Sequence, residues 1–354
     1  EDMKGIILHG GHGTRLRPLT HTGPKQLLPI ANKPMSQYCV ESLKDAGIID
    51  IAIIIGGIGS DKVKEFYGDG SNFGVNFTYF QQDFPKGISH AVNLCKEFVG
   101  NEKFVVFLGD NIIQKSIKSY VHEFTSSDVA ASLLLCKVPN PSSFGIAELY
   151  EEKIVKIIEK PKEPKSNLAV TGIYFLTPLI FDIIKNLEPS WRNELEITDA
   201  LHQMLENKNK ITYHMITDYW KDTGTPEDVL HANKEILKKI KGKFDGKKDD
   251  ESIINENTII GKGSRIKGNS KISNSVIIGE NCIIENAQIG PYSSLGDNSI
   301  IISSKIENSI IMENCKINGD VSIKDSIIAK NSTINSEKNK NKVFLLGEGT
   351  KITL

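Results

Sequence analysis

The sequence predicts two domains: an α/β domain with a mostly parallel sheet, followed by a parallel β-helix. Two observations predict this fold. Over the first 240 residues, short apolar runs alternate with amphipathic stretches, which is typical of strand–helix–strand units. After residue 250, one branched apolar residue recurs every five or six positions among Gly, Asn and Ser, which is typical of stacked hexapeptide coils. A chain of 354 residues with 39% hydrophobic residues can bury both cores.

The predicted strands of the first domain are short runs rich in apolar or β-branched residues: Lys4–Leu8, Ile51–Ile55, Phe104–Leu108, Val129–Lys137, Val170–Leu176 and Ile211–Ile216. Between them, Met35–Ala46 and Ser89–Val99 are amphipathic and predict helices. Parallel sheets of α/β proteins bind ligands beyond the carboxyl ends of their strands. Each motif that directly follows a strand is therefore a candidate site.

A lysine-rich stretch separates the strand–helix pattern from the hexapeptide repeat. Residues 234–248 contain seven lysines and two glycines, which we interpret as a helix end and a solvated linker, with an anion-binding patch as the alternative. We place the first domain at residues 3–240, the linker at 241–250 and the β-helix at 251–336. Residues 337–354 break the repeat and form a C-terminal tail with no predicted role.

The repeat itself favours a β-helix over a β-sandwich, because a sandwich needs turn signals every 8–12 residues. We expect three hexads per coil, with the branched residues stacked in a dry interior. The residues that define the repeat are Ile254, Ile260, Ile266, Ile272, Ile278, Ile284, Ile289, Leu295, Ile301, Ile306, Ile311, Ile317, Ile323, Ile328 and Ile334.

Composition excludes several classes of protein. Lys and Arg number 43 against 44 Asp and Glu, a net charge of -1 that argues against bulk nucleic-acid binding. No apolar run reaches the length of a membrane span or a signal peptide, so no membrane partner is expected. The five cysteines are odd in number and lack a CxxC spacing, which argues against structural zinc and a disulfide framework. A reducing cytoplasmic location is expected.

The strongest chemical signal follows the first strand. Residues 10–20 read GGHGTRLRPLT and residues 23–25 read GPK. Glycines let a backbone turn tightly and present N–H groups to an anion, while Arg15 and Lys25 add the positive charge that a triphosphate requires. The segment is not a Walker loop, because no Gly-Lys-Ser/Thr follows. It is not a dinucleotide fingerprint either, because Leu16 stands where a glycine is needed.

These segments resemble the signature of sugar-1-phosphate nucleotidylyltransferases. Further matches are GDGSNFG (68–74), LGDN (108–111), FG (144–145), EKP (159–161), ELEITD (194–199) and WKDTG (220–224). Together they resemble the glucose-1-phosphate thymidylyltransferases over residues 4–235, and the hexads resemble the left-handed β-helix of the long form. The resemblance implies a Rossmann-like nucleotidyltransferase domain followed by a left-handed parallel β-helix. It also implies a homo-oligomer formed through the β-helix or the catalytic domain.

Two aspartates lie where a metal could bind. Asp110 follows the strand over Phe104–Leu108, and Asp222 follows the strand over Ile211–Ile216 across a short turn. A lone aspartate after a strand is more often a helix cap or turn residue. Two carboxylates that meet at strand ends can hold Mg²⁺ against phosphates. Because both motifs match the family, we predict Asp110 and Asp222 as metal ligands and Mg²⁺ as the cofactor.

The resemblance assigns the remaining roles by motif. Catalytic residues would be Arg15, Lys25, Asp110 and Lys160. The nucleotide would be bound by Gly10, Gly11, Gly13, Thr14, Arg15, Lys25, Gln26, Gln82 and Gly87, with the Gln82 amide reading a pyrimidine edge. The sugar phosphate would be bound by Asn111, Gly145, Glu159, Lys160 and Val170. We interpret Glu194 and Glu196 as residues of a helix start, and Trp191 and Trp220 as packing residues.

The predicted reaction is dTTP and α-D-glucose 1-phosphate to dTDP-glucose and pyrophosphate. Three alternatives stay open: the same chemistry with UTP or a broad range of sugar phosphates, a bifunctional nucleotidylyl- and acetyltransferase, and a regulatory subunit without catalysis. Intact Arg15, Lys25, Asp110 and Asp222 argue against the regulatory subunit. The hexads contain no histidine, the usual general base, which argues against acetyl transfer there.

Overall fold

The computed structural model describes residues 3–354, which form two compact units. The first unit contains residues 3–12, 22–27 and 35–222. The second contains residues 223–354 together with two short N-terminal segments, 13–21 and 28–34. The boundary between the units therefore precedes residue 240, and the predicted domain limits stay predictions. No helix among residues 3–354 has the length and apolar character needed to cross a membrane.

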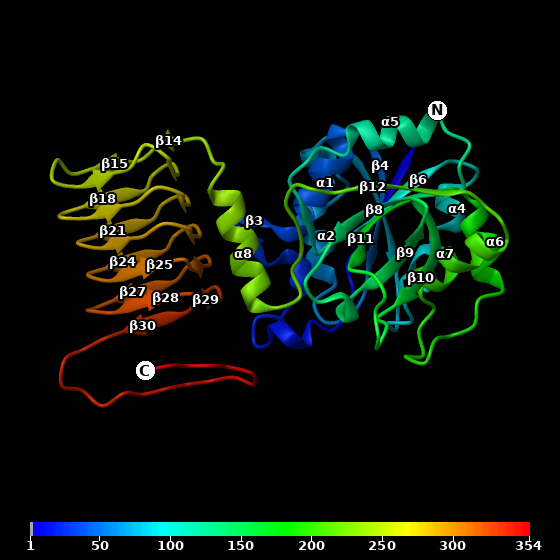
Figure 1. The fold of residues 1–354 in the computed structure, drawn as a ribbon. Coiled ribbons are helices and arrows are strands. Elements are labelled where there is room, and N and C mark those ends of the chain that lie inside the picture. Colours follow the sequence, from blue (N-terminus) through cyan, green and yellow to red (C-terminus); the bar gives the residue numbers. More distant parts are fainter. Residues whose placement is uncertain (1–2) are drawn as a thin grey trace. The chain divides into compact units, whose positions relative to one another are not determined.

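The first unit is built on one mixed nine-stranded sheet (Figure 1). Its central path runs β10-β9-β11-β6-β1-β4-β5, and β8 pairs with β11 and β12. Strands β6, β1, β4 and β5 are mutually parallel, whereas β11 runs antiparallel to β6, β8 and β9. The strand bounds are β1 (Lys4–Leu8), β4 (Asp50–Ile55), β5 (Asn76–Gln81), β6 (Phe104–Leu108), β8 (Ala131–Lys137), β9 (Gly145–Tyr150), β10 (Lys153–Glu159), β11 (Leu168–Leu176) and β12 (Ile211–Met215). The strands expected from the sequence are confirmed.

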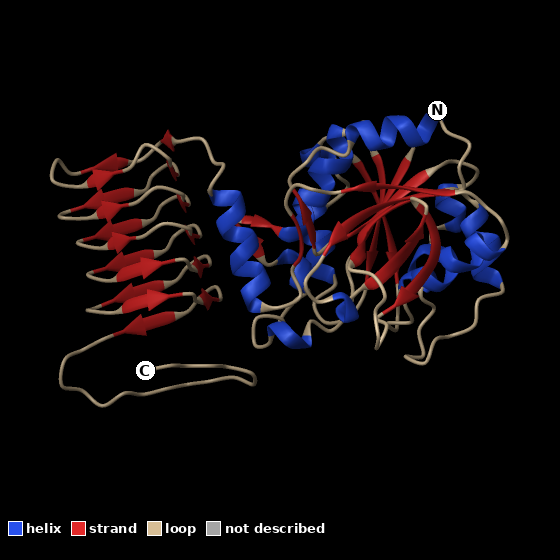
Figure 2. Ribbon diagram, in the orientation of Figure 1, coloured by secondary structure: helices blue, strands red, loops and turns tan. Residues whose placement is uncertain are grey.

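Helices cover both faces of this sheet (Figure 2). Side chains alternate along a strand, so Ile7 packs into one core with α1, α2 and α5, and Ile6 into the other with α3, α4, α6 and α7. The helix bounds are α1 (Met35–Asp45), α2 (Asp61–Tyr67), α3 (Ile88–Asn93), α4 (Lys96–Val99), α5 (Lys118–Ser126), α6 (Leu179–Lys185) and α7 (Ile197–Glu206). The α/β class of this unit is thus confirmed.

One predicted helix is divided. The stretch expected over Ser89–Val99 forms α3 and α4, with a tight turn between them. The amide of Cys95 bonds the carbonyl of Val92, three residues back, where a regular helix bonds four back. Gly100 then ends α4 at a positive φ of 61°.

The second unit contains the predicted β-helix, with strands stacked in three parallel sheets (Figure 1). The first sheet holds β14 (Lys243–Phe244), β17 (Thr258–Ile260), β20 (Val276–Ile278), β23 (Ser293–Leu295), β26 (Ile310–Ile311) and β29 (Ile327–Ile328). The second holds β15 (Lys247–Lys248), β18 (Arg265–Lys267), β21 (Ile283–Glu285), β24 (Ile300–Ile302), β27 (Lys316–Asn318) and β30 (Thr333–Asn335). The third holds β16 (Ile253–Ile254), β19 (Lys271–Ile272), β22 (Gln288–Ile289), β25 (Lys305–Glu307) and β28 (Ser322–Lys324).

The interior of the coils is the expected apolar ladder. In the middle coils the repeat residues are fully buried, for example Ile284 and Ile301 at 0% exposure. The corners explain the Asn and Gly content, because a left-handed backbone is needed there: Asn281, Asn298 and Asn314 have φ of 55°, 60° and 55°. Each hexad of the sequence therefore corresponds to one side of a coil, with its branched residue in the interior.

Helix α8 (Pro226–Leu237) and a short hairpin, β2 (Pro29–Ile30) and β3 (Lys33–Pro34), pack on the first β-helix sheet. The fully buried Asn233 joins them. Its Oδ1 accepts from the amide of Ala31 at 2.7 Å and from Ser294 Oγ at 3.3 Å. Asn32 of the hairpin turn donates to the carbonyl of Leu295 at 2.7 Å. The second unit is thus held by buried amide groups as well as by apolar packing.

We expect Ile301→Ala to destabilise the β-helix by about 2–5 kcal/mol, because it opens a cavity in a rigid ladder. Both tryptophans lie in the first unit, so β-helix unfolding should appear in far-UV circular dichroism with no change in tryptophan fluorescence. Ile253→Ala is the matched control, since that side chain is 59% exposed. Equal denaturation midpoints for the two variants would contradict the interior ladder.

Candidate active site

Several predicted nucleotide-binding residues of the first unit lie where neighbouring parallel strands end. Residues 9–12 follow β1, Gly56 follows β4, Gln82 follows β5 and Gly109 follows β6. The order β6-β1-β4-β5 makes these chain ends adjacent, as the sequence analysis required. Gly11 has a φ of 84°, so the turn after β1 depends on glycine.

A buried ion pair lies at the end of β6. Lys25, in the 3₁₀ turn Lys25–Leu27, places its Nζ 2.6 Å from Asp110 Oδ2, and both side chains are under one-fifth exposed. Asn111 Nδ2 donates to Asp110 Oδ1 at 3.1 Å. Burial acts to raise the pKa of Asp110, but the Lys25 ammonium and the hydrogen bonds outweigh it and lower the pKa below its usual range. Asp110 is therefore a carboxylate at neutral pH.

Asp222 is brought to the same place by a small antiparallel ladder. Strand β7 (Asn111–Ile113) pairs with β13 (Trp220–Asp222), and the register sets Asp222 opposite Asn111, the residue after Asp110. The two predicted metal ligands thus lie on adjoining strand ends. Among the described residues no group of three or more His, Cys, Asp or Glu side chains could hold a metal ion. Mg²⁺ accepts such a sparse donor set, because it keeps several waters and binds substrate phosphates.

Asn111 has a role that its motif did not reveal. Its Oδ1 accepts from the amide of Gly172 at 3.0 Å and from Trp220 Nε1 at 2.8 Å, and the side chain is buried. With Nδ2 bound to Asp110, the carboxamide ties β7, β11 and β13 together and orients Asp110. Trp220 is a packing residue, as expected, and its indole N–H is satisfied. The predicted contact of Asn111 with a sugar stays a prediction.

Two glutamine amides flank Gly10. Gln26 is buried and donates from Nε2 to the Gly10 carbonyl at 3.1 Å, which fixes its orientation. Its Oε1 has no hydrogen-bond partner among the described residues. On the other side, Gln82 Oε1 lies 4.0 Å from the position that a Cβ on Gly10 would occupy. Gln82 Nε2 is engaged by the Gly87 carbonyl at 3.4 Å and by His90. These predicted nucleotide-binding residues are therefore neighbours.

His9 adds no positive charge to this region. The His9 ring is buried and packs edge-on against the Tyr67 ring, with 6.0 Å between the ring centroids. Burial lowers the pKa of His9 to about 3, although the charge of Asp110 acts in the opposite direction. The ring is thus neutral at physiological pH.

The loop 13–21, which carries Thr14 and Arg15, belongs to the second unit. It closes on itself, because Thr20 Oγ1 donates to the Gly13 carbonyl at 2.7 Å. A Cβ on Gly13 would lie 2.8 Å from Thr20 Cγ2, and its φ is 57°, so this position requires glycine. Arg15 is exposed, and its guanidinium rests on Gly224, where a Cβ would come within 2.6 Å of Nη2.

The predicted sugar-phosphate residues lie on the antiparallel side of the sheet. Glu159 ends β10 opposite Gly145, the first residue of β9. A Cβ on Gly145 would be 2.6 Å from Thr198 Cγ2 and 3.1 Å from Glu159 Oε2. Glu159 Oε2 accepts from Thr198 Oγ1 at 3.0 Å. Lys160 follows with an exposed side chain, and Val170 is buried in the neighbouring β11.

Arg192 is the residue that the sequence analysis missed. Its guanidinium lies 3.7 Å from Glu159, 3.4 Å from Glu194 and 3.3 Å from Glu196. Burial raises the pKa of Glu159, while Thr198, Lys160 and Arg192 act to lower it. Arg192 thus supports the charged form of Glu159. Trp191 beside it is 80% exposed, so the interpretation of Trp191 as a packing residue is wrong.

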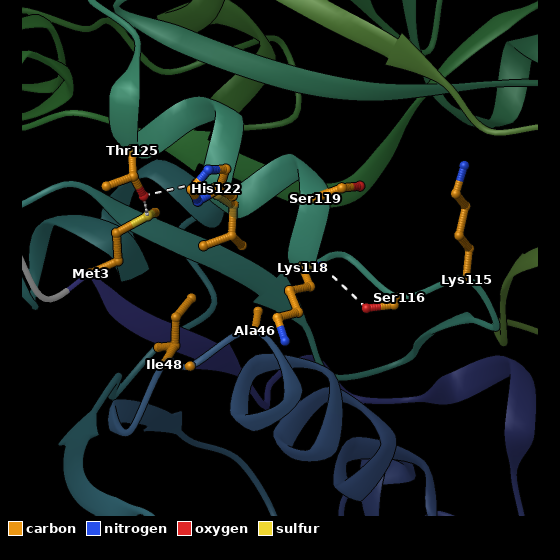
Figure 3. Close-up of a pocket in the computed structure, with 11 residues that line it drawn as sticks. Met3, Ala46, Ile48, Lys115, Ser116, Lys118, Ser119, His122 and Thr125 are labelled. Atoms are coloured by element: carbon orange, nitrogen blue, oxygen red, sulfur yellow. Dashed lines mark hydrogen bonds between the residues drawn. The ribbon is translucent and has the colours of Figure 1, made fainter.

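A cavity of about 670 Å³ lies elsewhere, at the amino end of β1 (Figure 3). It is lined by Met3, Ala46 to Ile48 and residues of α5 such as His122 and Thr125, whose hydroxyl donates to Met3 Sδ at 3.0 Å. No predicted site residue lines it. The cavity therefore lies apart from the predicted nucleotide-binding residues, several of which follow the opposite ends of the parallel strands.

Two family descriptions match the chain. Residues 4–239 match "Nucleotidyl transferase", and residues 283–353 match "GMPPB C-terminal domain". The first match covers the glycine segment, both predicted metal ligands and the predicted sugar-phosphate residues.

Similar proteins extend the comparison to the whole chain. The low-salt glycan biosynthesis nucleotidyltransferase Agl11 of Haloferax volcanii is 41% identical, over 99% of this chain and all of the relative. A glucose-1-phosphate thymidylyltransferase of Streptomyces antibioticus is 41% identical, over 90% of this chain and 89% of the relative. A Bacillus anthracis crystal structure assigned as a glucose-1-phosphate thymidylyltransferase is 47% identical, with a TM-score of 0.62, covering 65% of this chain and 94% of the other. The chain belongs to the nucleotidyl transferase family and is a sugar-1-phosphate nucleotidyltransferase.

Proposed function

We propose that this enzyme transfers thymidylate from dTTP to α-D-glucose 1-phosphate, giving dTDP-glucose and pyrophosphate. The observation that carries the proposal is the pairing of β7 with β13, whose register sets Asp222 opposite Asn111, the residue after Asp110, while Asp110 itself pairs with Lys25. It gives two carboxylates and one ammonium, the charges that a metal-bound triphosphate needs. The thymidine and glucose assignments are supported by the names of the relatives in Streptomyces antibioticus and Bacillus anthracis.

The chemistry requires no nucleophile from the protein. An oxygen of the sugar phosphate attacks the α-phosphorus of dTTP, the bond to the β-phosphate oxygen breaks, and pyrophosphate leaves with its electron pair. Lys160, on the exposed turn after β10, would hold the attacking phosphate. Lys25 and Arg15 would neutralise the triphosphate. Catalysis would thus rest on positioning and on charge neutralisation.

Mg²⁺ fits the donors present. Asp110 is held ionised and Asp222 lies on the adjoining strand end, so the two carboxylates supply oxygen donors of the kind that the ion prefers. When bound, the ion would neutralise charge on the reacting phosphates. Asp110 and Asp222 are the residues that would hold it, and Asn111 orients the first of them.

A pyrimidine base suits the two amides around Gly10. Thymine and uracil present an N3–H donor, and the orphaned Gln26 Oε1 and the Gln82 Oε1 are acceptors. A buried acceptor left without a donor costs about 1–3 kcal/mol, so a ligand that supplies one is favoured. The amides do not distinguish thymine from uracil. A methyl contact adds only about 1–3 kcal/mol of discrimination, so UTP is the main alternative.

A glucose unit suits the opposite side. Glu159 Oε2 accepts from Thr198 and Oε1 lies 3.7 Å from Arg192, and the lone pairs not used in these contacts would accept hydrogen bonds from sugar hydroxyls. The absence of a side chain at Gly145 lets Thr198 and Glu159 approach its backbone closely. Val170 would contribute its backbone.

The test is a pyrophosphate-release assay over a grid of dTTP, UTP, CTP, ATP and GTP against several sugar 1-phosphates. The expected maximum is dTTP with glucose 1-phosphate. A maximum with UTP would transfer the assignment to the alternative. A separate incubation with acetyl-CoA and glucosamine 1-phosphate tests the bifunctional alternative, and efficient acetylation would establish it.

Asp110→Asn and Asp222→Asn should each lower kcat by at least about 100-fold, because each removes a charge that holds the metal in the transition state. Steady-state kinetics at saturating substrates measure the effect. Asp182→Asn, an exposed aspartate in α6, is the matched control and should stay within about two-fold of the parent. Near-parental turnover in either site variant would remove that residue from the metal site.

Lys25→Met should destabilise the enzyme by up to about 3 kcal/mol at pH 7, because it leaves the buried Asp110 without its cation. The folded-state pKa of Asp110 is depressed, so the pair stabilises the protein above the ordinary Asp pKa of about 3.9 and loses this effect as the pH falls. The difference in unfolding free energy between parent and variant should therefore shrink below about pH 4. Urea titrations at pH 7 and at successively lower pH measure it, and a constant difference would contradict the pair.

A further inference from the structure

The chain entering α3 is joined by backbone hydrogen bonds to the loop that precedes α7. The amide of Leu195 donates to the Lys86 carbonyl at 2.8 Å, and the amide of Ser89 donates to the Leu195 carbonyl at 3.0 Å. Gly87 lies between these bonds with a φ of 99°, and a Cβ there would be 2.4 Å from the Leu195 oxygen. This close approach requires glycine, so the two segments are fitted backbone to backbone.

Ser89 adds a buried side-chain bond to this junction. Its Oγ donates to the carbonyl of Glu196 at 3.0 Å, and both residues are buried. Glu196 directly precedes α7, whose second residue, Thr198, donates from Oγ1 to Glu159 Oε2 at 3.0 Å. The bond from Ser89 therefore fixes the backbone at the start of the helix that carries one contact of the Glu159 carboxylate.

On the other side of Glu196, the chain forms a turn. The amide of Ser190 donates to the Glu194 carbonyl at 2.8 Å, and Ser190 Oγ donates to Glu196 Oε1 at 3.1 Å. Arg192 lies within this turn, with Nη1 3.3 Å from Glu196 Oε1 and 3.7 Å from Glu159 Oε1. Arg192 thus reaches Glu159 from a turn that closes on Glu196.

Charge alone does not fix this cluster. The single guanidinium of Arg192 contacts three carboxylates, those of Glu159, Glu194 and Glu196. Burial raises the pKa of Glu196, and the charge of Glu159 raises it further, so these carboxylates oppose each other. The geometry of the cluster therefore depends on hydrogen bonds from elements outside it, and the bonds from the start of α3 are of this kind.

We propose that Ser89 is a positioning residue for the sugar substrate, acting through the chain at Glu196 on the contacts of Glu159. The inference rests on the proposed function, because Glu159 is assigned there to the glucose unit. Ser89 lies two residues after Gly87, which is assigned to the nucleotide. A residue that follows the nucleotide-binding segment therefore sets the affinity for the other substrate.

The experiment compares Ser89→Ala with Thr177→Val in the full-length enzyme. Ser89→Ala should raise KM for glucose 1-phosphate by about three- to ten-fold, the effect expected of one buried hydrogen bond, with KM for dTTP within about two-fold of the parent. Ser190→Ala, which loses the bond to Glu196 Oε1, should raise the same KM.

Thr177→Val is the matched control, because it also removes a bond from a hydroxyl to a distant carbonyl. Thr177 Oγ1 donates to Ala130 at 2.8 Å, and Thr177 follows β11 beside the amino end of β6. Both KM values should stay within about two-fold of the parent. Equal KM for glucose 1-phosphate in Ser89→Ala and Thr177→Val would overturn the proposal, and so would an equal rise of both KM values in Ser89→Ala.

A second readout does not depend on turnover. Tryptic cleavage after Arg192 should be faster in Ser89→Ala than in Thr177→Val, because the turn is less firmly held. Cleavage after Lys115 is the internal control, since Lys115 is exposed and precedes α5, which packs on the other face of the sheet from α7. Equal cleavage after Arg192 in the two variants would overturn the positioning role.

This proposal and the proposed function fail in different ways. If the substrate grid favours UTP, the same comparison of KM for the sugar phosphate is made with UTP, so the loss of the thymidine assignment leaves the test of Ser89 intact. If no pair of substrates in the grid is turned over, the proposed function is overturned, and the role of Ser89 toward a sugar with it. Faster cleavage after Arg192 in Ser89→Ala would then establish only that Ser89 holds the turn.

Discussion

A carboxylate buried at the end of β6 needs a cation, and this need organises the first unit. Lys25 meets Asp110 at 2.6 Å, so the 3₁₀ turn that carries Lys25 is tied to the end of the strand. Asn111 holds the other oxygen and is itself fixed by β11 and β13. Removing either partner leaves a buried charge, which costs far more than the pair contributes. The carboxylate that suits a metal is therefore also a structural constraint.

The mixed sheet keeps the predicted nucleotide-binding residues apart from the predicted sugar-binding residues. The parallel strands β1, β4 and β5 end in backbone turns and amides, which suit a base and phosphates. The antiparallel strands β9, β10 and β11 place Glu159 and Gly145 opposite each other, which suits a sugar. Asp110 follows β6, the strand between the two supports in the sheet order. An in-line transfer needs its two reactants on either side of the charge-neutralising group, and the strand order agrees with the proposed arrangement.

The sequence predicts those features that depend on residues close together in the chain. The hexads, the strands and the glycine requirement at positions 11 and 13 follow from periodicity and from φ, and the structure confirms them. The role of Asn111, the cluster around Arg192 and the exposure of Trp191 depend on contacts between residues distant in sequence. No spacing reports such contacts. The close approach of Gly349, in the C-terminal tail, to the Arg17 backbone also joins residues distant in sequence, so no spacing predicts it.

Hydrogen bonds fix the hairpin that follows the glycine signature to helix α8 and to the β-helix. The hairpin that directly follows Lys25–Leu27 is fixed by Asn233 and by the bond from Asn32 to Leu295. Stacked coils of buried isoleucine form a rigid support for such bonds, because each coil is held by the next through parallel ladders. The β-helix carries none of the predicted site residues, but it fixes the conformation of the hairpin that directly follows Lys25–Leu27 in the sequence.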